Sequence, residues 1–157
     1  MKPSPKTSPS PRPLVTLPCL CANLRRTTRA VTHLYEEAIR PSGLRATQFT
    51  ILQVLERTGE ITQGQLGELL AMDSTTLTRT LQIMCRSGWV AERRGDDRRE
   101  RRLQLSKAGR ALLRRATPAW EKAQSRLAEA LGDDSWHNLF TLTGEVTKLA
   151  TSQGDLS

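Results

Sequence analysis

Apolar residues recur at intervals of three and four along most of the chain, which is the spacing of one face of an α-helix. This spacing predicts helices over residues 19–40 and 47–57, a long helix over 106–131 and a last helix over about 133–150. Pro118 lies inside the long helix, where it removes one backbone hydrogen bond and should kink the helix. We therefore expect a mainly α-helical fold.

The central part of the chain starts with two short helices. Thr62 and Gln65 form a capping box, in which each side chain satisfies an otherwise unpaired backbone N–H, and the first helix is predicted to begin there. Its apolar positions are Leu66, Leu69 and Leu70. Asp73 or Ser74 caps the second helix, and Gly88 ends it in the left-handed conformation that glycine adopts readily.

The second of these helices has two faces of different chemistry. One face carries the apolar residues Leu77, Leu81 and Met84 at helical spacing. The other carries hydroxyl groups and one guanidinium, which can reach base edges and phosphates of DNA. These candidate DNA contacts are Ser74, Thr75, Thr76, Thr78 and Arg79. The pattern is typical of a recognition helix.

Two short strands follow the second helix. Trp89 and Val90 begin the first strand, residues 95–97 supply a turn, and Leu103 and Leu105 alternate with polar residues in the return strand. Arginines flank the hairpin tip, where an arginine can enter the narrow, electronegative minor groove. The candidate contacts of this wing are Arg94, Asp97, Arg98, Arg99 and Arg101. Together the two helices and two strands predict a winged helix-turn-helix.

The overall composition supports a polyanionic partner. The chain has 157 residues, a net charge of +8 and a pI near 10.2, which favours nucleic acid first and an anionic membrane surface second. No run of apolar residues is long enough to span a membrane, and with nucleic acid favoured over a membrane surface we expect no membrane partner. Three cysteines, without a secretory signal, predict a reducing, cytoplasmic location.

We expect one folded domain between two disordered ends. Residues 1–18 are a predicted proline-rich tail, and residues 151–157 a frayed end. The domain, residues 19–150, contains a DNA-binding lobe over about 44–106, flanked by helices whose apolar faces this small lobe cannot cover. A second copy of the chain would cover them, and a two-fold homodimer suits a pseudo-palindromic operator.

Four short segments resemble the MarR family of bacterial transcription regulators: Asp73–Arg79, Gly88–Val90, Asp97–Arg99 and Leu105–Gly109. The resemblance runs from about Cys19 to Ala150, which is nearly the whole chain. It implies a homodimer with helical dimerisation regions flanking two winged lobes, and repression as the default activity. It also implies that Arg99 enters the minor groove while Asp97 holds it extended.

Members of this family usually couple DNA affinity to a small ligand or an oxidant. Cys19 and Cys21 form a C-x-C at the start of the first predicted helix, where backbone N–H groups and Arg25 and Arg26 can stabilise a thiolate. Oxidant sensing, packing as small buried residues and metal capture all remain open for this pair. Two thiolates fall short of the four ligands of a structural zinc site, so we predict no metal site.

The first helix is also similar to the organic-hydroperoxide-sensing branch of the family, matched without gaps from Leu20 to Gln48. The similarity places Cys21 on the oxidised sensor cysteine of that branch and Tyr35 on one of the tyrosines that hydrogen-bond it. Arg25 and Ala46 occupy the other two tyrosine positions.

Two other classes of function compete with DNA binding. A thiol-dependent oxidoreductase could use the C-x-C, but the chain has no βαβ pattern and no glycine-rich phosphate loop, and we predict neither enzymatic activity nor a cofactor. A winged helix that binds protein and has lost DNA readout is the second alternative. The presence of Arg79, Asp97 and Arg99 argues against it.

Overall fold

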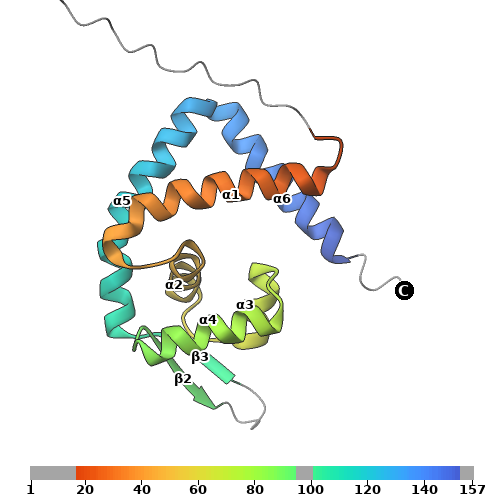
Figure 1. Ribbon diagram of the computed structural model, residues 1–157. Coiled ribbons are helices and arrows are strands. Elements are labelled where there is room, and N and C mark those ends of the chain that lie inside the picture. Colours follow the sequence, from red (N-terminus) through yellow and green to blue (C-terminus); the bar gives the residue numbers. More distant parts are fainter. Residues whose placement is uncertain (1–16, 95–100, 153–157) are drawn as a thin grey trace, which may run out of the picture.

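The computed structural model describes residues 17–94 and 101–152. The helices and strands follow one another as α1 (Leu20–Ile39), the 3-10 turn η1 (Arg40–Ser42), α2 (Ala46–Thr58), β1 (Ile61–Thr62), α3 (Gln63–Leu70), α4 (Ser74–Arg86), β2 (Val90–Arg94), β3 (Arg101–Leu105), α5 (Lys107–Leu131) and α6 (Asp133–Ser152). Figure 1 shows a lower lobe that contains α2, α3, α4 and the sheet, and an upper part in which α1 lies beside the long helix α5. The predicted fold class, helical with a small β-wing, is confirmed.

The sheet has one strand more than predicted. Its order is β1-β3-β2, and all pairs are antiparallel. The central strand β3 places Leu103 opposite Ile61 on β1, and Leu105 opposite Val90 on β2. A strand of two residues has no period that a sequence pattern could show. The strand nevertheless fixes the start of α3, because Thr62 ends β1 and also caps α3.

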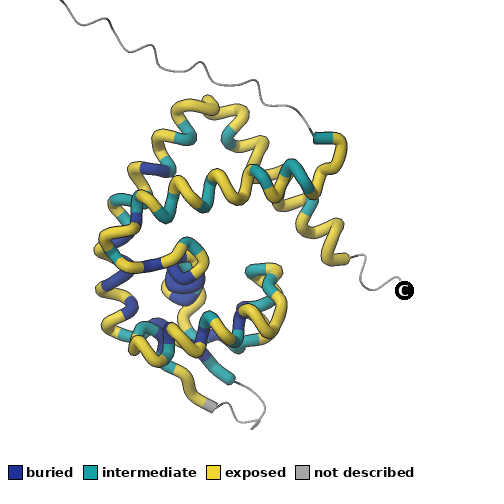
Figure 2. The backbone as a smooth tube through the Cα atoms, viewed as in Figure 1, coloured by how far each residue is buried: buried dark blue, intermediate teal, exposed yellow. Residues whose placement is uncertain are grey.

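The hydrophobic core lies in the lower lobe, where the buried residues of Figure 2 concentrate. Helix α2 supplies Phe49, Ile51, Leu52 and Leu55, each at most 2% exposed. The buried positions contributed by the other elements of this lobe include Leu66, Leu77, Leu81, Met84, Val90 and Leu103. Leu69, one of the apolar positions noted in the sequence, does not face the core: its side chain is 63% exposed, because α3 is short and turns only a narrow face, centred on Leu66, toward the core.

Hydrogen bonds of Ser106 connect the segment between α4 and β2 to the beginning of α5. Ser106 caps α5 by accepting a hydrogen bond from the backbone N–H of Gly109 (2.9 Å), and its hydroxyl donates to the carbonyl of Gly88 (2.6 Å). Its own N–H donates to the carbonyl of Trp89 (3.1 Å). The serine and glycine of this segment therefore tie the end of α4 to the long helix α5.

The apolar faces of the outer helices are only partly covered within one chain. The exposed large apolar side chains of α1, α5 and α6 are Leu20, Leu24, Leu34, Leu131, Leu139, Phe140, Leu142 and Leu149. Helix α6 begins at Asp133, directly after Gly132, which is the predicted start. It continues to Ser152, past the expected end at residue 150. No helix among the described residues has both the length and the apolar character needed to cross a membrane.

Candidate nucleic-acid interface

Helix α4 is fixed at both ends by local hydrogen bonds. Asp73 is the N-cap, and its carboxylate accepts from the backbone N–H of Thr76 (2.8 Å). Hydrogen bonds from Thr76, first from its side chain and then from its backbone, hold the pKa of Asp73 below its ordinary value. At the other end Gly88 has a φ of +72°, and the N–H of Trp89 donates to the carbonyl of Met84 (2.9 Å). Both ends of α4 are therefore closed by capping hydrogen bonds.

The predicted two faces of α4 are present in the structure. Leu77, Leu81 and Met84 are each at most 1% exposed, which anchors the helix in the core. On the outer side Ser74, Thr75, Thr76 and Arg79 are exposed, and Thr78 is half-buried. A helix anchored in the core thus displays hydroxyl groups and one guanidinium to solvent, and these groups suit base edges and phosphate oxygens.

Gln63, the first residue of α3, belongs to this surface and was missed in the sequence. Its Nε2 donates to Oγ1 of Thr78 on α4 (2.8 Å), and its Oε1 is buried with no hydrogen-bond partner among the described residues. Leaving such a group unpaired costs about 1–3 kcal/mol. The sequence held only a weak signal for this role of Gln63. Its position directly after the cap Thr62 predicts that Gln63 begins a helix, but it does not predict the contact with Thr78.

The stem of the wing is crossed by ion pairs. Arg93 on β2 and Arg102 on β3 both bind Glu60, with Nη2 of Arg93 2.6 Å and Nη1 of Arg102 3.3 Å from Oε1 of Glu60. The side-chain hydrogen bond from Arg93 is the main cause that lowers the pKa of Glu60. Two nitrogens of Arg101 each lie 2.6 Å from the carboxylate of Glu92, and this pairing raises the pKa of Arg101.

The predicted DNA contacts of the wing differ in their surroundings, and only some of them lie among the described residues. Arg101, a predicted DNA contact, is held along the stem by Glu92, across β2 and β3. Arg94 is the last residue of β2, with its backbone paired to Arg101. Asp97, Arg98 and Arg99 lie outside the described residues.

The candidate sensing residues are not brought together within one chain. Cys19 and Cys21 are exposed at the start of α1, so the interpretation of both as buried packing residues does not hold for a single chain. Tyr35 lies on the same helix, about 21 Å from Cys21 along the axis at 1.5 Å per residue. Its hydroxyl donates to Gln124 on α5, and burial raises its pKa.

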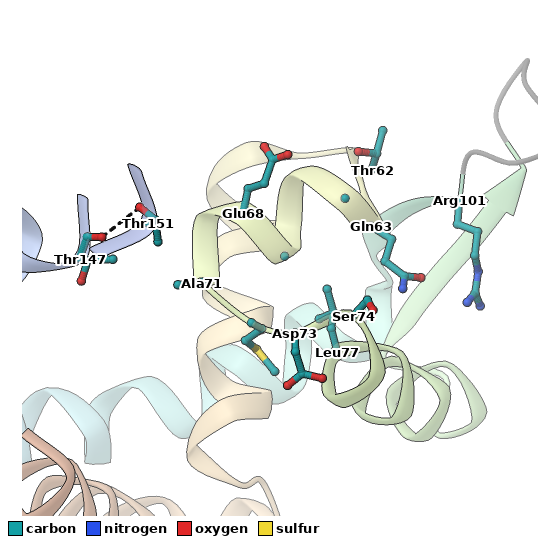
Figure 3. Close-up of a pocket in the computed structure, with 13 residues that line it drawn as sticks. Thr62, Gln63, Glu68, Ala71, Asp73, Ser74, Leu77, Arg101, Thr147 and Thr151 are labelled. Atoms are coloured by element: carbon teal, nitrogen blue, oxygen red, sulfur yellow. Dashed lines mark hydrogen bonds between the residues drawn. The ribbon is translucent and has the colours of Figure 1, made fainter. Parts of the chain in front are cut away.

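A cavity lies between α3, the start of α4 and the end of α6 (Figure 3). Its volume is about 1040 Å³, and Asp73 and Ser74 line it together with Thr147 and Thr151 of α6. A second cavity of about 600 Å³ is bordered by Cys21 and other residues of α1 and by α6. The described part of the chain contains no cluster of three or more histidine, cysteine, aspartate or glutamate residues that could hold a metal ion.

Comparison with known proteins places this geometry in a family. The model of the MarR family matches residues 42–108. YwoH of Bacillus subtilis, described as an uncharacterized HTH-type transcriptional regulator, is 31% identical over 88 residues, which are 56% of this chain and 64% of that protein.

Solved structures extend the likeness beyond the matched segment. The transcriptional regulator MosR of M. tuberculosis, crystallised with DNA, is 34% identical with a TM-score of 0.79, covering 85% of this chain and 97% of that one. The transcriptional repressor CouR, bound to a 23-mer DNA duplex, is 25% identical with a TM-score of 0.74, covering 82% of this chain and 92% of that one. The family model, the sequence identity to MosR and the shared fold lead to one conclusion: this chain belongs to the MarR family.

Proposed function

We propose that the chain is a transcription regulator that binds double-stranded DNA through the outer face of α4. The observation that carries this proposal is the exposed row of Ser74, Thr75, Thr76 and Arg79 on a helix whose opposite face is fully buried. A helix with that arrangement can enter the major groove without loss of packing. MosR and CouR, which share the fold, were both solved with DNA.

Selection of duplexes from a random pool, followed by equilibrium binding, tests this proposal. Arg79→Ala should weaken binding to the selected duplex by about 1–3 kcal/mol, the usual contribution of one good base contact. Arg126→Ala removes the same charge from an exposed position on α5 and serves as the matched control. Equal affinities of the two variants, or recovery of no preferred sequence, would contradict the proposal.

We further propose that the wing supplies contacts in the minor groove through Arg99, with Asp97 beside it and Arg94 and Arg98 on the flanking phosphates. Arg99→Ala should weaken binding to every duplex. It should also make the slope of log affinity against log salt concentration shallower by about the amount that one phosphate contact contributes. Arg101 has a different role in this proposal: its ion pair with Glu92 stiffens the stem that carries the tip. Unchanged affinity and salt dependence for Arg99→Ala would exclude the wing tip.

The functional unit is proposed to be a homodimer. Leu139, Phe140, Leu142 and Leu149 are between 40% and 66% exposed on α6, and a second copy would cover them. Phe140→Asp should convert the dimer to monomer in sedimentation equilibrium. Thr141→Asp introduces the same charge at an exposed position of α6 that faces away from the mean direction of these four side chains, and it should leave the dimer intact. A wild-type monomer at binding concentrations would overturn the proposal.

DNA release is proposed to follow oxidation of Cys21, which is exposed as an oxidant sensor must be. Its thiolate attacks an organic hydroperoxide, the O–O bond breaks, and sulfenic acid and an alcohol result; condensation with a second thiol would release water and form a disulfide. Cumene hydroperoxide should then release DNA from the wild type but not from Cys21→Ser. Burial raises the pKa of Cys85, so Cys85→Ser serves as the control that behaves like the wild type.

A small-molecule effector is the alternative to oxidation. The cavity of about 1040 Å³ is of a size suited to such a ligand, and it touches both Asp73 at the start of α4 and Thr151 near the end of α6. A ligand bound there would shift α4 relative to the outer helices. If hydroperoxide reduces DNA binding equally in the wild type and in Cys21→Ser, oxidation of Cys21 is not the cause of DNA release.

A further inference from the structure

Thr78 is held differently from other threonines in the helices of this chain. Thr50, Thr58, Thr80 and Thr117 each donate their hydroxyl to the carbonyl four residues earlier, which satisfies the hydroxyl locally. The hydrogen bond that the structure gives to the Thr78 side chain comes instead from another helix, from Nε2 of Gln63. The orientation of its hydroxyl is therefore set by α3.

Gln63 is well placed to fix that orientation. It extends from the first turn of α3 toward the start of α4, as Figure 3 shows. Its amide is enclosed there, since Oε1 is buried and Nε2 is engaged with Thr78. A threonine on a helix chooses between two side-chain rotamers, and a fixed donor beside it selects one of them.

We propose that Gln63 is a positioning residue that sets the DNA sequence preference through Thr78, an inference that rests on the proposed function. The amide of Gln63 occupies a lone pair of Oγ1, so the hydroxyl hydrogen of Thr78 points away as a donor. A donor matches guanine O6, purine N7 and thymine O4, and it does not match the amino groups of adenine or cytosine. Gln63 acts here without touching DNA.

A double-mutant cycle tests this inference. Gln63→Met keeps the length of the side chain and removes its donor, while Thr78→Val keeps the shape of threonine and removes the hydroxyl. The quantity measured is the ratio of affinities for the selected duplex and a scrambled duplex of equal length. Each single variant should lower this ratio about 3- to 10-fold, the usual effect of one hydrogen bond. The double variant should lower it no further.

Further measurements separate positioning from general damage to the fold. Gln104→Met changes an exposed glutamine of β3 and should leave the ratio unchanged. In Gln63→Met the slope of affinity against salt should equal that of the wild type, because no phosphate contact is lost. Thr78→Ser keeps the hydroxyl that Gln63 positions. The affinity ratio of Gln63→Met/Thr78→Ser should therefore be about 3- to 10-fold lower than that of Thr78→Ser alone. If Gln63→Met unfolds, Gln63→Ala replaces it in the cycle.

Two results would overturn the inference. An unchanged ratio in Gln63→Met, with a lowered ratio in Thr78→Val, would show that Thr78 needs no positioning. Effects that multiply in the double variant would show that Gln63 contacts DNA itself. Failure of the proposed function has a separate signature, since the wild type would then not distinguish the two duplexes, and the inference would fall with it.

Discussion

Gly109→Ala is the substitution whose effect the structure predicts most sharply. The first turn of α5 lies so close to Trp89, the residue before β2, and to the end of β3 that a Cβ on Gly109 would be 2.1 Å from the carbonyl oxygen of Trp89 and 2.8 Å from Cδ1 of Leu105. Ordinary contacts between heavy atoms are about 3.5 Å, so α5 must move by more than about 1 Å. The hydrogen bond from the N–H of Ser106 to the carbonyl of Trp89 would then be broken or stretched.

The expected loss of stability follows from three contributions. Forcing an extra methyl into a packed site costs about 1–3 kcal/mol. The lost backbone hydrogen bond adds about 1 kcal/mol, and the better helix propensity of alanine returns about 1 kcal/mol. The free energy of unfolding of Gly109→Ala should therefore be lower than that of the wild type by about 1–3 kcal/mol.

Urea unfolding measures this change at one fixed protein concentration, because the apparent stability of the proposed dimer would depend on concentration. Gly144→Ala is the matched control: it lies in α6, where an added Cβ meets nothing within 4 Å. It should raise the free energy of unfolding by about 0.5–1 kcal/mol. If Gly109→Ala raises the free energy of unfolding as Gly144→Ala does, the close approach of Gly109 to Trp89 is refuted.

Two pH and charge predictions concern the caps and the wing. Asp73 stabilises the fold when ionised, because hydrogen bonds from Thr76 lower its pKa; this stabilisation should be present above about pH 4 and lost as the pH falls through the lowered pKa. Asp73→Asn should abolish that part of the acid dependence measured by urea unfolding, and an unchanged acid dependence would contradict it. Glu60→Gln should speed hydrogen exchange of the β2 and β3 amides, because Arg93 and Arg102 lose their shared carboxylate, and exchange identical to that of the wild type would contradict the role of Glu60.

Local chemistry explains why the sequence predicted so much of the fold. The starts of α3, α4 and α5 coincide with the capping residues Thr62, Asp73 and Ser106, because each cap acts within three residues of itself. The buried face of α4 followed from its spacing, since one long apolar stripe has one way to face the core. The exposed apolar residues of the outer helices were likewise visible as stripes that a small lobe could not cover.

The features that escaped prediction depend on contacts between distant parts of the chain. Strand β1 exists because Ile61 meets Leu103, and no local pattern records that pairing. The burial of Leu66 and exposure of Leu69 depend on the angle at which α3 meets the core. In the candidate site, the engagement of Arg101 by Glu92 depends on the register of β2 and β3.

Chemical protection of guanine N7 on a selected duplex tests the proposed DNA reading most directly. N7 lies in the major groove, which α4 is proposed to occupy. The wild-type protein should protect two clusters of guanines, one per half-site, whose centres lie about one helical turn or a multiple of it apart, and Arg79→Ala should lose protection in both clusters. Binding to the duplex without protection of N7 in either half-site would contradict reading by α4.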